Sequence, residues 1–566
     1  MKKYYLQYFI LALVLISALV IRLTNLDKAG GLWYDEMTIY SIASKSFPAG
    51  MMTEDLHRFL LFPLYFLAYK SWMIIFGNSD FAVRFMSVFF DMAGLICAYF
   101  VGTCFAQLIN KHEVKNKIGL FNATLYAINS SFIYYAQEAK FYSLTFFLIN
   151  LLIIFWLKML KEPTRKNKIF FLVSNALLLY TYTSQLALIL ILQLATFCYL
   201  YINNKSGIKK HLDLALGSIT VLLPLLVIIL TNKDYFSGNF DAIVYDHSFI
   251  LLVIQNWFSP ILVGLQNNVL SYQWVVLSQI LSVKWWLFVF FPVIFYLVLI
   301  LKGSRKEPLS KLFLATGLSY LIFHLILSST GKYAVLVRYV LPALPFFLPP
   351  AAYGLVKICS TNKGRVFFTL FLLVNLLALN SPIGATKIKR PDGYKALAEV
   401  LASNKITPES DFILPIRVSL LDKYYKIDGE KHSLYWLNSP EWQKTYLTDS
   451  EIEKINTKQN LYQGYRRFLL SHEISIGFKN LVETVFINKT KKGQKLVLIT
   501  DLSICLYNDQ MIDQIVSKEN LYTKNPIQFL RLSKLNNNLI KVLSEKMRLE
   551  KVVKLNDWQI YAFSAK

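Results

Sequence analysis

Two adjacent carboxylates, Asp35 and Glu36, follow the first hydrophobic segment of the chain and a Gly-Gly pair at positions 30 and 31. They open a short amphipathic pattern at the expected membrane surface, where a carboxylate is costly to desolvate and therefore suggests a function. A carboxylate held there can act as a general base that takes the proton of an attacking hydroxyl. Acidic residues also favour the first turn of any helix, and adjacent residues do not share a helix face. We therefore expect one carboxylate to enter a site and the other to cap or position it.

A second set of polar residues stands at the entries to other hydrophobic segments. The set comprises Arg84; Glu138, Lys140 and Tyr142; and Arg338 with Tyr339. Cations at three such entries suit an anionic headgroup, because Arg and Lys hold phosphate through charge-assisted hydrogen bonds. The alternative for Arg84 is a snorkelling side chain, which commonly marks a helix end. The alternative for Glu138 and Lys140 is a solvated pair in a turn.

The sequence gives weak support for a metal site. The five cysteines form no ligand spacing, which argues against a disulfide framework and against a zinc site built on cysteine. His57, His247 and His324 do not form a ligand spacing either. A bound divalent cation therefore stays open, with His57 as a weak candidate ligand.

Composition divides the chain into two parts. Hydrophobic residues make up 55% of the 566 residues, and the mean hydropathy is +0.42, whereas soluble proteins average about 45–50% apolar residues. Nearly all the long apolar runs fall in residues 1–382, while 383–566 read as an ordinary soluble chain. The sequence predicts a polytopic α-helical membrane domain over 1–382, with a first outward loop at 22–81, followed by a soluble α/β domain over 383–566.

Eleven segments are apolar and long enough to be considered as membrane spans, with an upper range of about 11–13 helices. They are residues 5–21, 82–109, 118–135, 141–157, 169–182, 185–203, 214–231, 285–301, 312–329, 339–356 and 366–382. The segment 60–76 is also apolar but carries Pro63 and Lys70, and counting it as a span would reverse every later loop. We interpret it as an interfacial or shallow re-entrant helix.

The basic residues set the orientation. Alternate loops between the spans hold 18 Lys and Arg residues against four acidic ones, which places them in the cytoplasm by the positive-inside rule. The formal net charge of +25 is explained by these loops, so no nucleic-acid partner is expected. The Asp35 segment, the other polar entries and the C-terminal domain then face outward, in a multi-pass protein of the inner or plasma membrane.

The C-terminal part reads as α/β. The pattern predicts helices over 392–404 and 535–547, and strands over 411–415, 495–500 and 558–564. No GxGxxG, P-loop, HExxH or GxSxG motif occurs there, so the motifs of common soluble enzymes do not assign it a chemistry.

Five short motifs, taken in order, resemble the GT-C glycosyltransferases. They are WYDEMTIY, FPLYF, GNSDFAVRFMS, YYAQEAKFYS and RYVLPALP. The resemblance is to the bacterial branch related to protein O-mannosyltransferases and to the aminoarabinose transferases of lipid A, and it covers about residues 1–360. Each motif is weak alone, and the ordered set is fairly specific.

The resemblance implies a catalytic Asp at Asp35, with Glu36 as the paired acid. It also implies roles for Arg84 and for the segment of Gln137, Glu138, Lys140 and Tyr142. It implies an inverting transfer of a monosaccharide from a polyprenyl-phosphate donor to a hydroxyl of a lipid (lipid A or core), a cell-surface glycan or a protein. It leaves dependence on a divalent cation open.

This chain departs from the family pattern at three places, one of which is Ser184, in a turn where relatives often carry a His. Lys140 replaces the usual Arg, which keeps the charge but loses the bidentate fork. Leu61-Phe62-Pro63 stands where relatives often read HPP or KPP, which puts a metal or phosphate contact from that position in doubt. Two other functions stay open: a lipid or glycan transporter or flippase, which should show intramembrane charges and internal repeats, and an inactive scaffold of the same fold.

Overall fold

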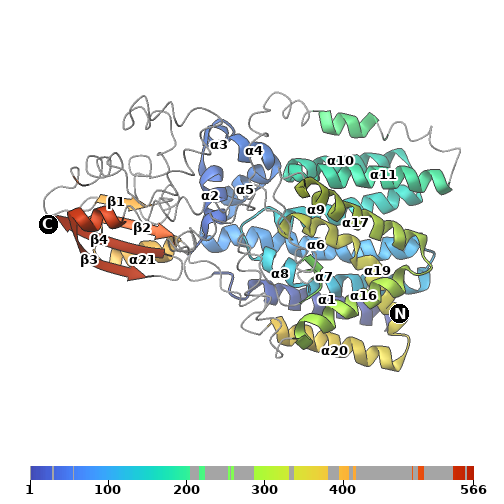
Figure 1. Ribbon diagram of the computed structural model, residues 1–566. Helices are drawn as coiled ribbons and strands as arrows, with labels where there is room; N and C mark the ends of the chain where they lie inside the picture. Colours follow the sequence, from blue (N-terminus) through green and yellow to red (C-terminus); the bar gives the residue numbers. More distant parts are fainter. Residues whose placement is uncertain are drawn as a thin grey trace. The chain divides into compact units, whose positions relative to one another are not determined.

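The structure is a computed structural model. It describes residues 2–27, 31–54, 56–203, 214, 216–223, 253–254, 257–259, 286–329, 337–379, 394–406, 412–415, 487, 495–501, 540–554 and 558–565. Two compact units divide the chain (Figure 1). The membrane unit contains Met1–Asp27 and Ile39–Lys389, and the second unit contains Lys28–Thr38 and Arg390–Lys566. The predicted domain boundary after residue 382 lies outside the described residues.

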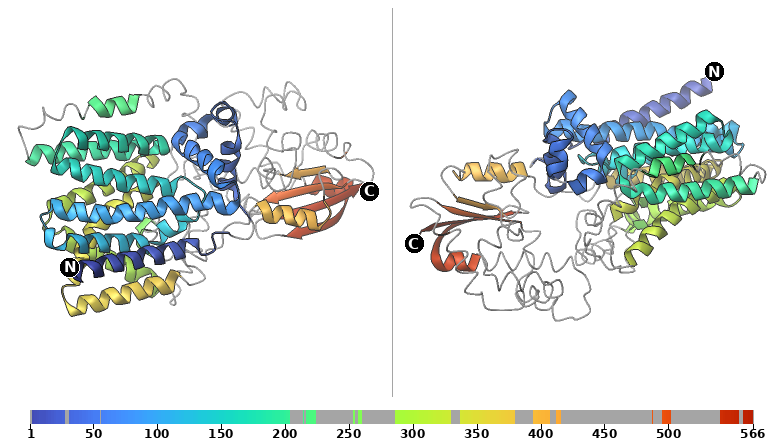
Figure 2. Two further views of the ribbon diagram at one scale, coloured as in Figure 1. Left: turned by 180° about the vertical axis from the view of Figure 1, so that it is seen from behind. Right: turned by 90° about the horizontal axis from the view of Figure 1, so that it is seen from above.

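The membrane unit is a bundle of apolar helices that run side by side (Figures 1 and 2). Within the described residues, six helices are long and apolar enough to cross a bilayer: Tyr5–Leu23, Asp80–Leu108, Tyr142–Lys161, Thr183–Tyr201, Pro308–Leu327 and Asn362–Leu379. The protein is therefore a polytopic α-helical membrane protein, as the sequence predicts. Of the eleven predicted spans, 214–231 lies only partly within the described residues.

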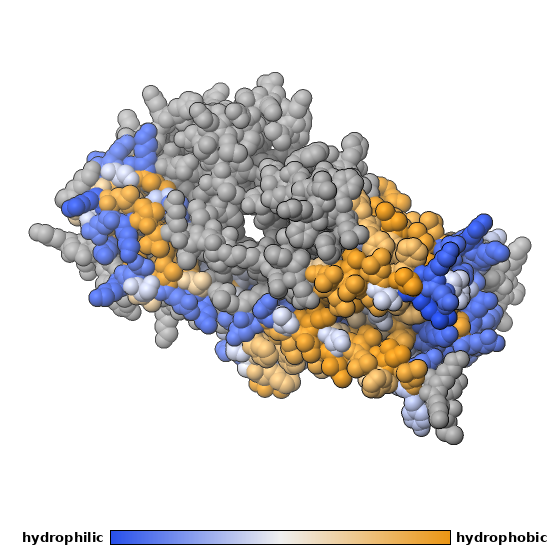
Figure 3. All heavy atoms as spheres, turned by 90° about the horizontal axis from the view of Figure 1, so that it is seen from below, coloured by the Kyte–Doolittle hydropathy of each residue, from blue (hydrophilic) through white to orange (hydrophobic). Residues whose placement is uncertain are grey.

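Apolar side chains cover the outside of this bundle, as contact with lipid requires. Ile16 on α1 (Lys2–Leu23) is 60% exposed, and Val366 on α20 (Asn362–Leu379) is 68% exposed. Figure 3 shows one broad apolar face of this kind. Inside the bundle the helices approach closely at glycines, a feature typical of membrane helices. A Cβ on Gly354 of α19 (Leu348–Ile358) would lie 1.9 Å from the Leu299 carbonyl of α16 (Trp286–Ser304).

The long helix α6 (Asp80–Leu108) lies at the centre of the bundle and packs against α7 (Lys115–Ala127) and α9 (Tyr142–Lys161). Three further helices pack nearby: α10 (Arg165–Thr181) contacts α9, and α11 (Leu186–Asn203) contacts α17 (Pro308–Ser329). Short turns join them, including η1 (His112–Val114) and η2 (Thr183–Gln185).

The prediction of one continuous span over 118–135 is wrong. The helix α7 ends at Ala127, and a separate short helix, α8 (Ser130–Ala136), follows. The break has a local cause, because the Asn129 side chain caps α8 by accepting from the backbone N–H groups of Ser131 and Phe132 at 3.0 and 3.3 Å. An Asn at this position competes for the backbone donors that a continuous helix would use.

Two other apolar segments are also interrupted. The predicted span 339–356 consists of α18 (Val337–Val340), η4 (Leu341–Phe346) and α19, with a bend of 47°. Prolines at 342, 345, 349 and 350 explain the bend, because each removes a backbone donor. The segment 60–76 contains the end of α4 (Leu56–Leu61) and α5 (Pro63–Phe76). At 14 residues, α5 is too short to cross a bilayer, consistent with its interpretation as a non-spanning helix.

The second unit contains a four-stranded sheet in the order β1-β2-β4-β3. The strands are β1 (Phe412–Pro415), β2 (Leu496–Asp501), β3 (Met547–Lys554) and β4 (Trp558–Ala565). β1 and β2 are parallel, and the other two pairs are antiparallel. One amphipathic helix, α21 (Tyr394–Ser403), buries Leu397 and Leu401. β1, β2, β4 and α21 lie where the sequence predicts them.

One strand of this sheet was not predicted. The helix predicted over 535–547 ends at residue 546 within the described residues, and β3 begins at Met547. β3 pairs with β4, with Val552 opposite Tyr561 and a register shift between Leu549 and Lys551. The charged sequence of this strand favours a helix locally, and cross-strand packing overrides that preference.

Candidate active site

The helix α2 (Tyr34–Ser44) carries Asp35 and Glu36 in its first turn. The two carboxylates have different environments. Glu36 is fully buried, and its Oε2 accepts a hydrogen bond of 3.2 Å from the backbone N–H of Trp33, the residue before the helix. This is the reciprocal half of a capping box, which fixes the start of a helix. Asp35 is partly exposed. Glu36 therefore positions the turn, whereas the Asp35 carboxylate is partly accessible to solvent.

The segment before α2 belongs to the second compact unit of the chain. The second unit includes Lys28–Thr38, and the backbone N–H of Tyr394, the first residue of α21, donates to the Leu32 carbonyl at 3.2 Å. The carboxylate pair thus starts in the same compact unit as the C-terminal sheet, although 383–566 was predicted to be separate from it.

In the membrane unit, the tight turn at residues 137–141 joins α8 to α9. Ser87 of α6 holds this turn, because its hydroxyl lies within hydrogen-bonding distance of the Glu138 carbonyl and 3.4 Å from that of Lys140. Arg84, one helical turn before Ser87, is buried and donates from Nη1 to the Leu26 carbonyl at 3.3 Å. Glu138 and Lys140 are buried as well. The structure therefore brings the Arg84 segment against the predicted 137–142 motif.

An aromatic cluster, formed by Phe62, Phe141, Tyr142 and Tyr182, adjoins this turn. The Phe141 ring lies 4.3 Å from Phe62, 4.4 Å from Tyr142 and 4.5 Å from Tyr182 between centroids. Lys140 Nζ lies 5.8 Å from the Tyr142 ring centroid, within cation–π range. Residues from the junction between α4 and α5, the 137–141 turn, α9 and the loop after α10 thus meet in one place.

Arg338 lies close to this aromatic cluster. Its guanidinium lies 5.6 Å from the ring centroid of Tyr339, and its charge acts electrostatically on the phenols of Tyr142 and Tyr182. The Tyr182 phenol can donate a hydrogen bond.

The backbone of Arg338 and Tyr339 is linked to two other helices. Tyr320 of α17 donates from its hydroxyl to the Tyr339 carbonyl at 3.2 Å, and Gln185 Nε2 donates to that hydroxyl at 3.2 Å. Gln185 is the last residue of η2, the turn that follows Tyr182 and joins α10 to α11. These contacts hold Arg338 next to the aromatic cluster.

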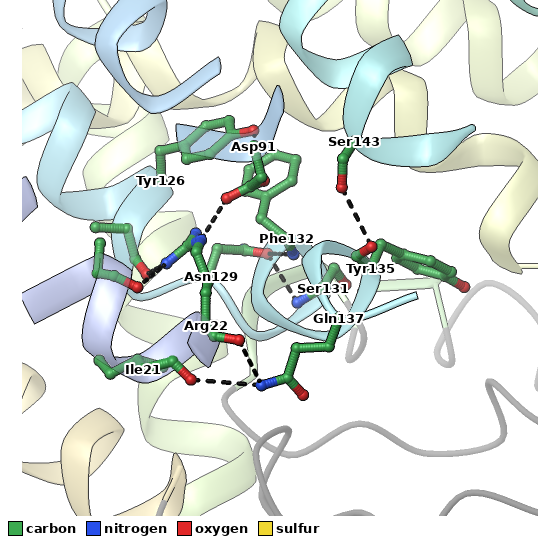
Figure 4. A network of polar contacts seen from close by, with 12 residues as sticks. Ile21, Arg22, Asp91, Tyr126, Asn129, Ser131, Phe132, Tyr135, Gln137 and Ser143 are labelled. Atoms are coloured by element: carbon green, nitrogen blue, oxygen red, sulfur yellow. Dashed lines mark hydrogen bonds and ion pairs between the residues drawn. The ribbon is translucent and has the colours of Figure 1, made fainter. Parts of the chain in front are cut away.

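A buried polar network supports this end of the bundle (Figure 4). Arg22, near the end of α1, forms an ion pair with Asp91 of α6, and both side chains are fully buried. The Tyr126 hydroxyl donates to Asp91 Oδ1 at 2.9 Å, and Arg22 Nη1 donates to the Ala127 carbonyl at 3.1 Å. Gln137 Nε2 donates to the carbonyls of Arg22 at 3.1 Å and Thr24 at 2.8 Å.

The pairing of Arg22 with Asp91 was not predicted from the sequence. The one available signal was that an Arg near the end of an apolar span requires a buried or interfacial partner. Residues 22 and 91 are 69 positions apart, so spacing could not connect them. The network fixes the end of α1, from which the chain leads toward Asp35.

No group of three or more His, Cys, Asp or Glu residues suited to a metal ion occurs within the described part of the chain. His57 lies on α4, but its side chain is outside the described residues. The proximity of Asp35 to Arg84 and Glu138 stays a prediction, because Asp35 and those residues belong to different units. The structure brings together two overlapping groups of predicted residues: the Arg84 segment with Glu138 and Lys140, and Lys140 with Tyr142, Arg338 and Tyr339.

No family model and no curated protein matches the sequence. Among solved structures, ArnT from Cupriavidus metallidurans in the apo state aligns with a TM-score of 0.50 and 12% identity, over 97% of both chains. The same protein bound to undecaprenyl phosphate aligns at 0.47 with 12% identity, over 97% of both chains. An Archaeoglobus fulgidus oligosaccharyltransferase aligns at 0.44 with 10% identity, over 99% of this chain and 74% of the other. The last two scores are below 0.5, and we base no argument on them.

The likeness to apo ArnT shows the fold. This chain has the GT-C fold, an α-helical membrane bundle followed by a C-terminal region with a small sheet. The fold predicted from the short motifs is thereby confirmed.

Proposed function

We propose that this protein is a membrane glycosyltransferase that moves a monosaccharide from a polyprenyl-phosphate donor to a hydroxyl acceptor on the extracytoplasmic side. The observation that carries this proposal is the meeting of the 137–142 segment, Tyr182 and Arg338 at one place in a GT-C fold. The aromatic faces offer an apolar wall for an isoprenoid chain, and the cations offer charge for its phosphate.

Asp35 is the general base in this mechanism. Alcohols are poor nucleophiles at neutral pH, so a carboxylate must take the hydroxyl proton as the oxygen attacks the anomeric carbon. The bond between that carbon and the phosphate oxygen breaks, and polyprenyl phosphate leaves with the electron pair. Attack on the face opposite the leaving group inverts the anomeric configuration. Glu36 stabilises the first turn of α2. Glu138 lies in the turn between α8 and α9, which also contains Lys140.

The leaving phosphate is stabilised by cations rather than by a general acid. Arg84, Lys140 and Arg338 supply the charge, with Tyr142 and Tyr339 beside them. Fixed cations aimed at developing negative charge are among the largest contributions to catalysis. Arg84 donates to the Leu26 carbonyl, and its guanidinium carries five N–H donors in all. The acceptor is a lipid, a glycan or a protein hydroxyl.

A transporter or flippase is the second candidate, and one observation weighs against it. Ionisable residues deep in a transporter bundle usually serve a substrate or proton pathway. Here the buried Arg22 and Asp91 pair with each other, and Tyr126 completes the contact. That arrangement links helices and does not require a transported ion.

Replacing Arg338 by Ala should weaken the binding of undecaprenyl phosphate, a polyprenyl phosphate of the class proposed as the leaving group. A charge-assisted hydrogen bond contributes about 1.5–3 kcal/mol, so we expect the dissociation constant to rise by roughly 10–100-fold. Binding can be measured by native mass spectrometry or by thermal shift of the purified protein. Arg84→Ala should likewise weaken donor binding more than acceptor binding.

Arg365→Ala is the matched control, because Arg365 is exposed and its side chain donates to the nearby Cys359 carbonyl, away from the aromatic cluster. Equal affinities for the parent, Arg338→Ala and Arg365→Ala would remove Arg338 from the phosphate site. A loss in Arg365→Ala as large as in Arg338→Ala would point to general surface charge instead.

The proposed orientation predicts opposite compartments for two reporters. A fusion at Lys166 should report the cytoplasm, because the loop around it is basic, and a fusion at the C-terminus should report the outside. Paired phosphatase and fluorescent-protein fusions measure this directly. If both positions report the same compartment, the placement of the C-terminal unit outside is wrong.

A further inference from the structure

The lysine in the middle of α5 has a structural partner that the sequence did not suggest. Lys70 Nζ donates to the Ser44 carbonyl at 3.1 Å and to the Lys45 carbonyl at 2.8 Å. Ser44 is the last residue of α2. Lys70 therefore caps the C-terminal end of the helix that carries Asp35 in its first turn. An ammonium group is well suited to this place, because the last carbonyls of a helix lack backbone donors and bear partial negative charge.

The helix α5 is itself fixed at two other points. Trp72 donates from Nε1 to the Ala82 carbonyl at 2.8 Å. Ala82 lies in the first turn of α6, two residues before Arg84. At its other end, Phe62 stacks on Phe141 in the aromatic cluster. One short helix thus contacts the entry to α6, the aromatic cluster and the end of α2.

A further contact joins α2 to the loop that follows α5. Asn78 Nδ2 lies 3.4 Å from the Tyr40 hydroxyl, within hydrogen-bonding distance. Tyr40 lies on α2, one turn before the carbonyls that Lys70 caps. The C-terminal half of α2 is therefore held laterally by Asn78 and axially by Lys70.

The energetics explain why a lysine is present at an otherwise apolar position. A charged group at a membrane surface is costly unless it is hydrogen-bonded. The carbonyls of Ser44 and Lys45 accept hydrogen bonds from the Lys70 ammonium and so offset that cost without a carboxylate partner. The eleven residues of α2 span about 16 Å at 1.5 Å per residue. A rotation of so short a helix about its fixed end moves a carboxylate at the other end by several ångströms.

We propose that Lys70 is a positioning residue for the transfer reaction, which sets the direction of α2 and thereby the place of Asp35. This inference rests on the proposed function. Lys70 does not touch donor or acceptor in this account. It acts through the helix axis, so its loss should change turnover more than donor binding. A misplacement of about 1 Å at a reacting group costs roughly 100-fold in rate.

The test compares Lys70→Met, Lys70→Arg and the control Lys363→Met, an exposed lysine at the start of α20. The probe is whichever polyprenyl-phosphate monosaccharide the parent protein turns over fastest. We expect Lys70→Met to lower kcat by roughly 10–100-fold, with the KM for the donor unchanged and faster amide hydrogen exchange over 34–44. Lys70→Arg should restore most of the rate, because a guanidinium can also donate to two carbonyls. Lys363→Met should match the parent.

Three results would overturn the inference: parental kcat in Lys70→Met, a loss that Lys70→Arg does not restore, or unchanged hydrogen exchange over α2. Asp35→Asn, measured in parallel, separates the two levels of the account. If Asp35→Asn turns over the donor as fast as the parent, the proposed function fails. If Asp35→Asn is inactive while Lys70→Met is fully active, only the role of Lys70 fails.

Discussion

Replacing Asp35 by Asn is expected to lower turnover of a polyprenyl-phosphate sugar by about 10²–10⁴-fold, the range typical of a lost general base. The change removes the basic oxygen but keeps the size of the side chain and its place in the first turn of α2. Binding of the donor phosphate should be unchanged, because the cations proposed to bind it are on other elements. Release of labelled sugar, measured with purified protein, gives the rate.

Glu36→Gln is the matched comparison for this experiment. A glutamine at this position can still accept the hydrogen bond from the Trp33 backbone N–H, because Gln also completes a capping box. We expect it to retain most of the parental rate, whereas Glu36→Ala should lose activity and stability together. An inactive Glu36→Gln beside an active Asp35→Asn would reverse the assignments of the two carboxylates.

Replacing Asp91 by Ala should destabilise the membrane unit by about 3–5 kcal/mol, because it leaves the Arg22 guanidinium buried without its counter-charge. Both side chains are fully buried, and Arg22 also binds the Ala127 carbonyl. The loss should appear as a lower melting temperature and a smaller monodisperse fraction in detergent. Turnover per folded molecule should fall as well, because Gln137 binds the carbonyl of Arg22.

A double replacement separates the charge effect from the packing effect. Arg22→Met combined with Asp91→Leu removes both charges, and such exchanges of buried pairs are often neutral or stabilising. The double variant should therefore be more stable than Asp91→Ala alone. If Asp91→Ala melts with the parent, the buried pair contributes nothing to the stability of the bundle.

Apolar runs predicted most of the membrane helices, because long hydrophobic segments have few other structures available in lipid. They did not predict the interruptions. The break at Asn129 depends on a side-chain cap, and the end of α4 before Pro63 depends on a proline in an apolar run. β3 was missed for a different reason: its charged sequence resembles a helix, and only its pairing with β4 makes it a strand.

The candidate site was predictable where polar residues stood at span entries, as at Lys140, Tyr142 and Arg338. Two contributions could not be read from spacing. Phe62 stacks on Phe141, although almost 80 positions separate them in the chain. Arg22 and Asp91 form an ion pair although they are also far apart in the sequence. Lys70 was noticed in the sequence as a charged residue in an apolar segment. Its hydrogen bonds to the Ser44 and Lys45 carbonyls could be seen only in the structure.

The most direct measurement supplies the purified parent protein with polyprenyl-phosphate monosaccharides and a membrane extract as the source of acceptors. Labelled sugar and free polyprenyl phosphate are then followed together. The account predicts that one donor is consumed, that polyprenyl phosphate appears in equal amount, and that the sugar becomes attached to an acceptor. The account would be contradicted if the protein moved the intact donor across a vesicle membrane and did not cleave its sugar–phosphate bond.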